Sequence, residues 1–258
     1  MPVQLLSITL AFLAFFLAFF LAAFLQPDGL ASEATVKAIT VRQISSGLGN
    51  VEVFIGKSAI RVNCVRGNCI VVSKAPDWQA LVYNRKDGTG RLIDRASWVG
   101  DGLRLGGFKK PFKRRKLEIK KLQKMGLPLL TVSVPVTHSG SGINGIFRSG
   151  RRDDIPALKA NLTCIDGLGL NAGQKDFLRG LYQSPPIGEM PFEMSYTRPG
   201  GKLDVQLRTI NWKKVEVPES IFRDDYKYKM APSVESIVLG NQFETIMDDL
   251  LGPPSKHK

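Results

Sequence analysis

The chain has 258 residues, of which 43% are hydrophobic and 23% charged, and its formal net charge is +13. This composition is that of a folded globular protein, and it excludes a wholly disordered chain and collagen-like or low-complexity fibres. Three cysteines are too few for a disulfide-dense mini-protein, and 25 glycines with 15 prolines indicate many turns rather than a helical bundle.

The first 34 residues contain a long apolar stretch. Residues 5–25 carry no charged side chain, and as a helix they would reach about 30 Å, the thickness of a bilayer core. One interpretation is a signal peptide, cleaved near the small residues Ala31 and Ala34. The other is a retained transmembrane anchor, favoured by the length of the stretch and by the absence of a preceding Lys or Arg. Both predict an exported or membrane-anchored protein, in the periplasm or cell envelope of a bacterium or the secretory pathway of a eukaryote.

Residues 35–252 are expected to form a single β-rich domain, because this length suits one domain and no internal repeat is visible. Residues 253–258 are expected to be a disordered tail. The first 34 residues hold two acids, Asp28 and Glu33, and no base, so the remaining chain carries a net charge of +15.

Alternating and β-branched runs predict antiparallel strands through most of the domain. Runs of about five to nine residues, with turn residues every eight to twelve, are typical of meanders, sandwiches and barrels. The expected strands are 36–44, 51–55, 58–63, 69–73, 79–83, 129–136, 158–165, 192–197, 203–211 and 213–217.

Two segments have a helical period instead. In 171–183, Asn171 can cap the helix and Gln174 follows three residues later, as a capping box requires. The segment 241–251 repeats this arrangement with Asn241 and Glu244. The fold class is therefore mostly β (α+β): an antiparallel curved sheet or half-barrel with two or three short helices, preceded by an N-terminal hydrophobic helix.

The strongest charge feature lies in an insertion expected at 99–126. Between Lys109 and Lys124 there are nine basic residues and one acid, Glu118, interleaved with apolar side chains. As a helix, this segment would be roughly amphipathic and would suit an anionic lipid surface. A solvated loop and a nucleic-acid contact are the alternatives, and nucleic acid is disfavoured for an exported chain. The predicted membrane- or anion-binding residues are Lys109, Lys110, Lys113, Arg114, Arg115, Lys116, Lys120 and Lys121.

Cys64 and Cys69 bracket a four-residue turn between two predicted strands. In an oxidising compartment we expect a disulfide between them, worth about 2 kcal/mol because the loop is short. We expect Cys164 to be a buried apolar side chain. The sequence shows no metal-ligand spacing and no catalytic constellation, so we expect no metal, no cofactor and no enzymatic activity.

The order of elements resembles the half-barrel fold of the bacterial outer-membrane lipoprotein carrier superfamily, which includes relatives of unknown function. The sequence segments that carry the resemblance are structural, and they span residues 36–230 loosely. They are Gln79–Asn84, Phe177–Tyr182 leading into Gly188–Phe192, and Val217–Phe222 followed by Asp225–Tyr228. The basic insertion departs from the pattern of the family.

The resemblance implies a concave sheet closed by helices over an apolar hollow that shelters acyl chains. The implied wall and lid residues are Val53, Ile55, Ile60, Val62, Val71, Val82, Phe177, Leu178 and Leu181. Either sheet face can be the inner one. The expected function is non-enzymatic binding of a lipid or lipidated protein, with the basic segment on an anionic membrane. The alternative is an envelope structural or adaptor protein with a solid core and no ligand.

Overall fold

The computed structural model describes residues 33–64, 68–103, 112, 117–136 and 157–239. Contacts divide the chain into two units, Met1–Thr35 and Val36–Lys258. Nearly all of the expected leader lies outside the described residues, as do the helix expected at 241–251 and the tail at 253–258.

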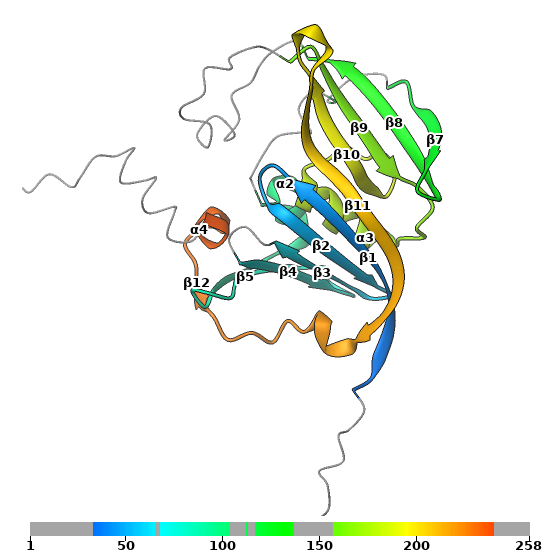
Figure 1. The fold of residues 1–258 in the computed structure, drawn as a ribbon. Coiled ribbons are helices and arrows are strands. Elements are labelled where there is room, and N and C mark those ends of the chain that lie inside the picture. Colours follow the sequence, from blue (N-terminus) through cyan, green and yellow to red (C-terminus); the bar gives the residue numbers. More distant parts are fainter. Residues whose placement is uncertain (1–32, 65–67, 104–111, 113–116, 137–156, 240–258) are drawn as a thin grey trace, which may run out of the picture. The chain divides into compact units, whose positions relative to one another are not determined.

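A single large curved sheet contains all the strands of the described residues (Figure 1). Its strand order is β12-β6-β5-β4-β3-β2-β1-β11-β10-β9-β8-β7. The strands are β1 (Thr35–Ser45), β2 (Gly49–Gly56), β3 (Ala59–Cys64), β4 (Cys69–Lys74), β5 (Ala80–Asn84), β6 (Thr89–Ile93), β7 (Lys120–Lys124), β8 (Leu127–Pro135), β9 (Lys159–Ile165), β10 (Met190–Thr197), β11 (Leu203–Pro218) and β12 (Lys229–Met230).

Strands β1 to β6 form a meander whose register places aliphatic side chains in rows. Val53 lies opposite Val62, Val62 opposite Val71, and Val71 opposite Val82. Because side chains alternate between the faces of a sheet, these valines share one face, which we call the first face. The neighbouring row, through Phe54, Arg61 and Val72, belongs to the second face.

The first face carries the main core and is covered by helices α2 (Arg95–Asp101), α3 (Ala172–Tyr182) and α4 (Val234–Leu239). The predicted capping box of α3 is confirmed: Asn171 accepts from the Gln174 amide, and Gln174 accepts from the Asn171 amide. Helix α3 begins directly after Asn171, and the chain leaves it through the left-handed residue Gln183.

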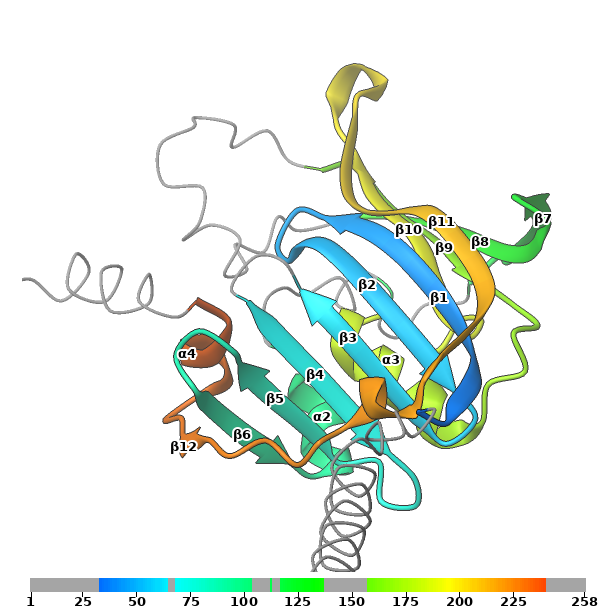
Figure 2. The same ribbon diagram turned by 60° about the horizontal axis from the view of Figure 1, so that its bottom comes forward.

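The second face is covered in part by the segment 219–230, which we call the strap. It begins as the 3-10 helix η4 (Glu219–Phe222) and ends in β12 beside β6. Figure 2 shows the strap on one side of β1–β6, and α2 and α3 on the other. Phe222 packs beside Ala38, Phe54 and Ala59 in a second, smaller core.

Tyrosine and arginine side chains hold the strap to the sheet. The Tyr226 ring stacks on Tyr83 at 4.6 Å between centroids. The buried Arg61 guanidinium donates to the Ile221 carbonyl and to the Tyr226 hydroxyl, each at 2.8 Å. Both faces of β3 and β4 are therefore buried, which explains the nearly continuous apolar run in β4.

The predicted fold class, a mostly β curved sheet with few short helices, is confirmed. Three predicted details are wrong. The strands expected at 203–211 and 213–217 form one strand, β11, whose residues remain extended through Trp212. The insertion expected at 99–126 ends as strand β7 rather than as a helix or loop. Its first residues belong to α2, which holds the buried Trp98.

Glycines allow α3 to pack closely on its neighbours. A Cβ at Gly173 would lie 2.2 Å from Nε1 of the Trp78 indole, and one at Gly180 would lie 2.5 Å from the Trp98 ring. Both indoles are buried, at 5% and 0% exposure. Because large aromatic rings have little room to move in a packed core, a methyl group at either position must displace the helix.

We predict that Gly173→Ala lowers the free energy of unfolding by about 1–3 kcal/mol because of this overlap. Gly100→Ala is the matched control, since Gly100 is exposed in α2 and nothing lies within 4 Å of its Cβ position. In the control, the better helix propensity of alanine should leave stability unchanged or raise it by up to about 1 kcal/mol. Chemical denaturation measures both, and equal effects of the two substitutions would contradict the packing described.

Candidate functional site

The nine residues expected to form an apolar hollow come together in one cluster of the core. Six lie on the first face of β2 to β5 and three on α3. All nine side chains are between 0% and 4% exposed. The structure therefore places the predicted wall and the predicted lid in one packed core.

Helix α3 contacts α2 as well as the sheet. The Trp98 ring stacks on Phe177 at 5.3 Å between centroids, and its indole N–H donates to the Phe177 carbonyl at 2.8 Å. Arg95 pairs with Asp176 on the outer side of this contact. The two helices thus form one unit over the first face.

Two polar contacts hold the ends of α3 on the sheet. At its start, the buried Gln174 amide donates from Nε2 to the Gly56 carbonyl at 2.7 Å. At its end, the Tyr182 hydroxyl donates to Gln43 Oε1. Between these ends the helix contributes Phe177, Leu178 and Leu181 to the apolar cluster.

Gln43 on β1 links the end of α3 to strands β10 and β11. Its Nε2 donates to the Pro191 carbonyl at 2.8 Å and to Thr209 Oγ1 at 3.0 Å, while its Oε1 accepts from Tyr182. Burial, with a smaller contribution from Cys64, raises the pKa of Tyr182 well above its usual value. The phenol therefore stays protonated and remains a hydrogen-bond donor at physiological pH.

One polar atom on the first face stands apart from this network. Ser73 lies opposite Ile60 and Ala80, and it is 2% exposed. Within the described part of the chain, its Oγ is a buried side-chain atom without a hydrogen-bond partner. Such a hydroxyl destabilises an aliphatic wall unless a partner reaches it.

Most of the predicted basic surface lies outside the described residues: Lys109, Lys110, Lys113, Arg114, Arg115 and Lys116. Lys120 and Lys121 are described, and both are exposed on β7. Phe112, between the undescribed stretches, is buried in the main core.

Cys64 and Cys69 lie directly opposite each other on β3 and β4, as the hairpin prediction required. The expected disulfide is not formed, because both are free thiols in the structure, as is Cys164. All three are buried, and burial raises the pKa of Cys64 and of Cys164 to about 12. The prediction for Cys164, a buried apolar side chain, is confirmed.

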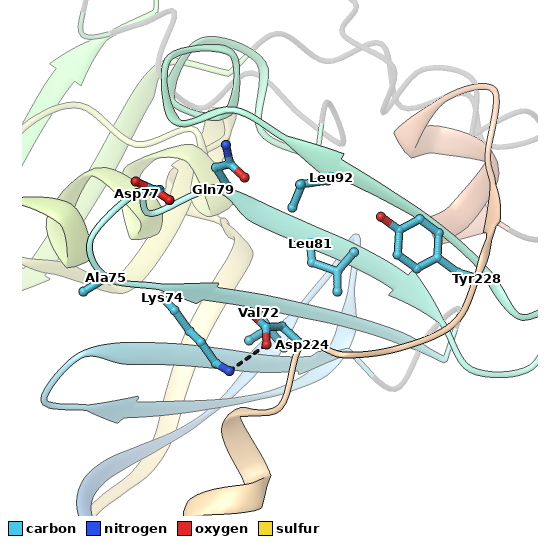
Figure 3. Close-up of a pocket in the computed structure, with 9 residues that line it drawn as sticks. All are labelled: Val72, Lys74, Ala75, Asp77, Gln79, Leu81, Leu92, Asp224 and Tyr228. Carbon is cyan, nitrogen blue, oxygen red and sulfur yellow. Dashed lines mark hydrogen bonds and ion pairs between the residues drawn. The ribbon is translucent and has the colours of Figure 1, made fainter.

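A pocket of about 310 Å³ lies on the second face, between the strap and the turn that joins β4 to β5 (Figure 3). Its floor is the cross-strand row Val72, Leu81 and Leu92. At its side, Lys74 Nζ pairs with Asp224 of the strap at 2.7 Å. This pocket was not predicted, although successive apolar residues in β4, whose side chains alternate between the two faces, indicate that the second face is covered too.

Within the described ranges, no group of three or more His, Cys, Asp or Glu side chains is placed to hold a metal ion. The helices described there are also too short or too polar to cross a bilayer.

Comparison with models of known protein families gives no match, and neither does comparison with curated proteins. Among solved structures, the chain is similar to a putative outer-membrane lipoprotein-sorting protein domain from Vibrio parahaemolyticus. The match has 9% sequence identity and a TM-score of 0.21, and it covers 69% of this chain and 85% of that domain. At this identity and TM-score, the match indicates neither a family nor a function for this chain.

The thiol count of the unfolded chain tests the state of the cysteines. We predict that an alkylating reagent labels none of them in the folded protein at pH 8, because all three are buried and protonated. After denaturation without reductant, mass spectrometry should find three labelled thiols. A single label would show that Cys64 and Cys69 are bridged in the isolated protein.

Proposed function

We propose that this chain is a non-enzymatic protein of the cell envelope or secretory pathway that binds the acyl chain of a lipid or lipidated protein between the first face and α3. The observation that carries the proposal is the valine row of β2 to β5 lying under a helix that is joined to the sheet by a polar contact at each end. An acyl chain that replaces the apolar residues of α3 would keep this face out of water.

The burial of the nine residues sets the condition for binding. Because their side chains already fill the space, an acyl chain enters only if α3 moves away from the sheet. To move α3 away from the sheet, the hydrogen bonds of Gln174 and Tyr182 and the apolar contacts of α3 must be broken. A binding-competent state that is seldom populated lowers the apparent affinity in proportion to its population.

Ser73 adds a polar group to this site. Its hydroxyl would donate to an ester or carboxyl oxygen of a lipid lying along the wall, and so would gain the partner that it lacks among the described residues. The N-terminal apolar stretch supports the proposed location, and the resemblance to lipoprotein carriers supports the ligand class.

A second function is favoured by the same burial. A core whose wall residues are between 0% and 4% exposed suits an envelope adaptor with a solid interior, whose partners bind on the outside. The two functions differ in whether α3 leaves the sheet when lipid is present.

Tyr182→Phe separates the two functions. The substitution keeps the ring, removes the hydroxyl and leaves Gln43 Oε1 without its donor, so we expect a loss of about 1–3 kcal/mol in the free energy of unfolding. If lipid binds beneath α3, the weaker attachment also raises occupancy by oleate and by lysophosphatidylglycerol several-fold. Native mass spectrometry of the full chain with these two probes measures the occupancy.

Ser73→Ala is a second test, placed on the wall. Loss of an unpartnered buried hydroxyl should leave stability equal or higher, while it lowers occupancy by the same probes. If neither the wild-type chain nor Tyr182→Phe retains a probe, lipid does not bind between the first face and α3. The proposal is then wrong, and the solid-core adaptor is the remaining candidate.

A further inference from the structure

Strand β7 forms one edge of the sheet, and all five of its residues are exposed. Lys120, Leu122 and Lys124 alternate with Lys121 and Gln123 along it. Lysines on an edge strand discourage pairing with a strand of another chain, because pairing would bring their charges out of water. The same lysines give this edge a positive charge, and among the described residues their one ion pair is a 3.8 Å contact between Lys120 and the exposed Glu118.

Large apolar side chains are exposed between these lysines. Ile119 is 48% exposed, Leu122 39% and Met125 42%. Trp212 of β11 lies beside them, since its indole N–H donates to the Met125 carbonyl at 2.9 Å. We call Ile119–Met125 together with Trp212 the β7 surface.

The chemistry of the β7 surface matches that of a bilayer interface. Lysine reaches phosphates with its ammonium group while its methylene stem covers apolar surface. Tryptophan is enriched at the headgroup level, where its ring is in an apolar environment and its N–H is in a polar one. Lys124 is exposed on β7, and its Nζ lies 5.4 Å from the centroid of the Phe192 ring, which is a cation–π contact.

We infer that the β7 surface docks on an anionic bilayer, with Leu122, Met125 and Trp212 entering the headgroup region and Lys120, Lys121 and Lys124 pairing with lipid phosphates. This inference rests on the proposed function and deepens it. It assigns the membrane contact to an edge strand, whereas the sequence suggested an amphipathic helix.

The tryptophans of the chain provide a test that the N-terminal apolar stretch does not confound. The sequence holds three, and two of them, Trp78 and Trp98, are 5% and 0% exposed. Full-length protein is mixed with vesicles of phosphatidylglycerol and phosphatidylcholine whose acyl chains are brominated, and tryptophan emission is recorded. Flotation with the vesicles reports any contact of the chain with lipid, but quenching of Trp212 reports only contact at the β7 surface.

We expect quenching with phosphatidylglycerol vesicles and little with pure phosphatidylcholine, and Trp212→Phe should abolish this difference. Since each lysine at an anionic surface changes affinity about fivefold, replacing Lys120, Lys121 and Lys124 by Glu should raise the lipid needed for half-quenching by about 100-fold or more. Leu122→Asp should also weaken quenching. Leu203→Asp is the control, because Leu203 is equally apolar, lies on β11 and is 55% exposed.

The same variants separate this inference from the proposed function. In Trp212→Phe, quenching by brominated oleate reports acyl chains near Trp78 or Trp98, both of which pack on α3, and so tests the site beneath α3. If the wild-type chain floats with anionic vesicles while its emission matches that of Trp212→Phe, the β7 surface does not touch the bilayer and the inference is overturned, whatever the hollow binds.

Discussion

Helix α3 packs on an aliphatic face of the sheet, and both the main core and the proposed site are arranged around this contact. The helix approaches closely because Gly173 and Gly180 leave room for the Trp78 and Trp98 indoles. Its buried polar groups then meet partners on the sheet, Gln174 at the Gly56 carbonyl and Tyr182 at Gln43. Apolar burial favours the docked helix without fixing its position, whereas the hydrogen bonds and the glycine contacts fix where it lies.

Gln43 extends this constraint across the sheet. Strand β1 lies between the meander β2–β6 and strand β11, and from β1 the Gln43 amide reaches Thr209 on β11 and the Pro191 carbonyl on β10. Movement of α3 therefore affects the place where the two halves of the sheet meet. The strap has a different role, because its Phe222 and Tyr226 cover the second face, where Tyr226 stacks on Tyr83 and accepts from Arg61 of β3.

The sequence predicted what local patterns determine. Period-two alternation located β1 to β5 and β8 to β10, and the Asn171–Gln174 capping box located α3. Helix α2 was missed because its seven residues bury one side chain, Trp98, and so show no apolar period. The end of the basic segment has the composition of an amphipathic helix, yet 120–124 pairs with β8, because an available sheet edge outweighs a weak helical preference. The nine wall and lid residues lie in one core cluster, and this grouping depends on tertiary packing that no local pattern encodes.

Hydrogen exchange along α3 distinguishes a helix that opens as a lid from a helix that is fixed in the core. If α3 is a lid held by its two end contacts, its amides exchange through a local opening at a lower free energy than the amides of β2 to β4, and added oleate changes the exchange of α3 more than that of the strands. If α3 exchanges only with global unfolding, at the free energy of the central strands and without response to oleate, the helix is a fixed part of a solid core and the account is wrong.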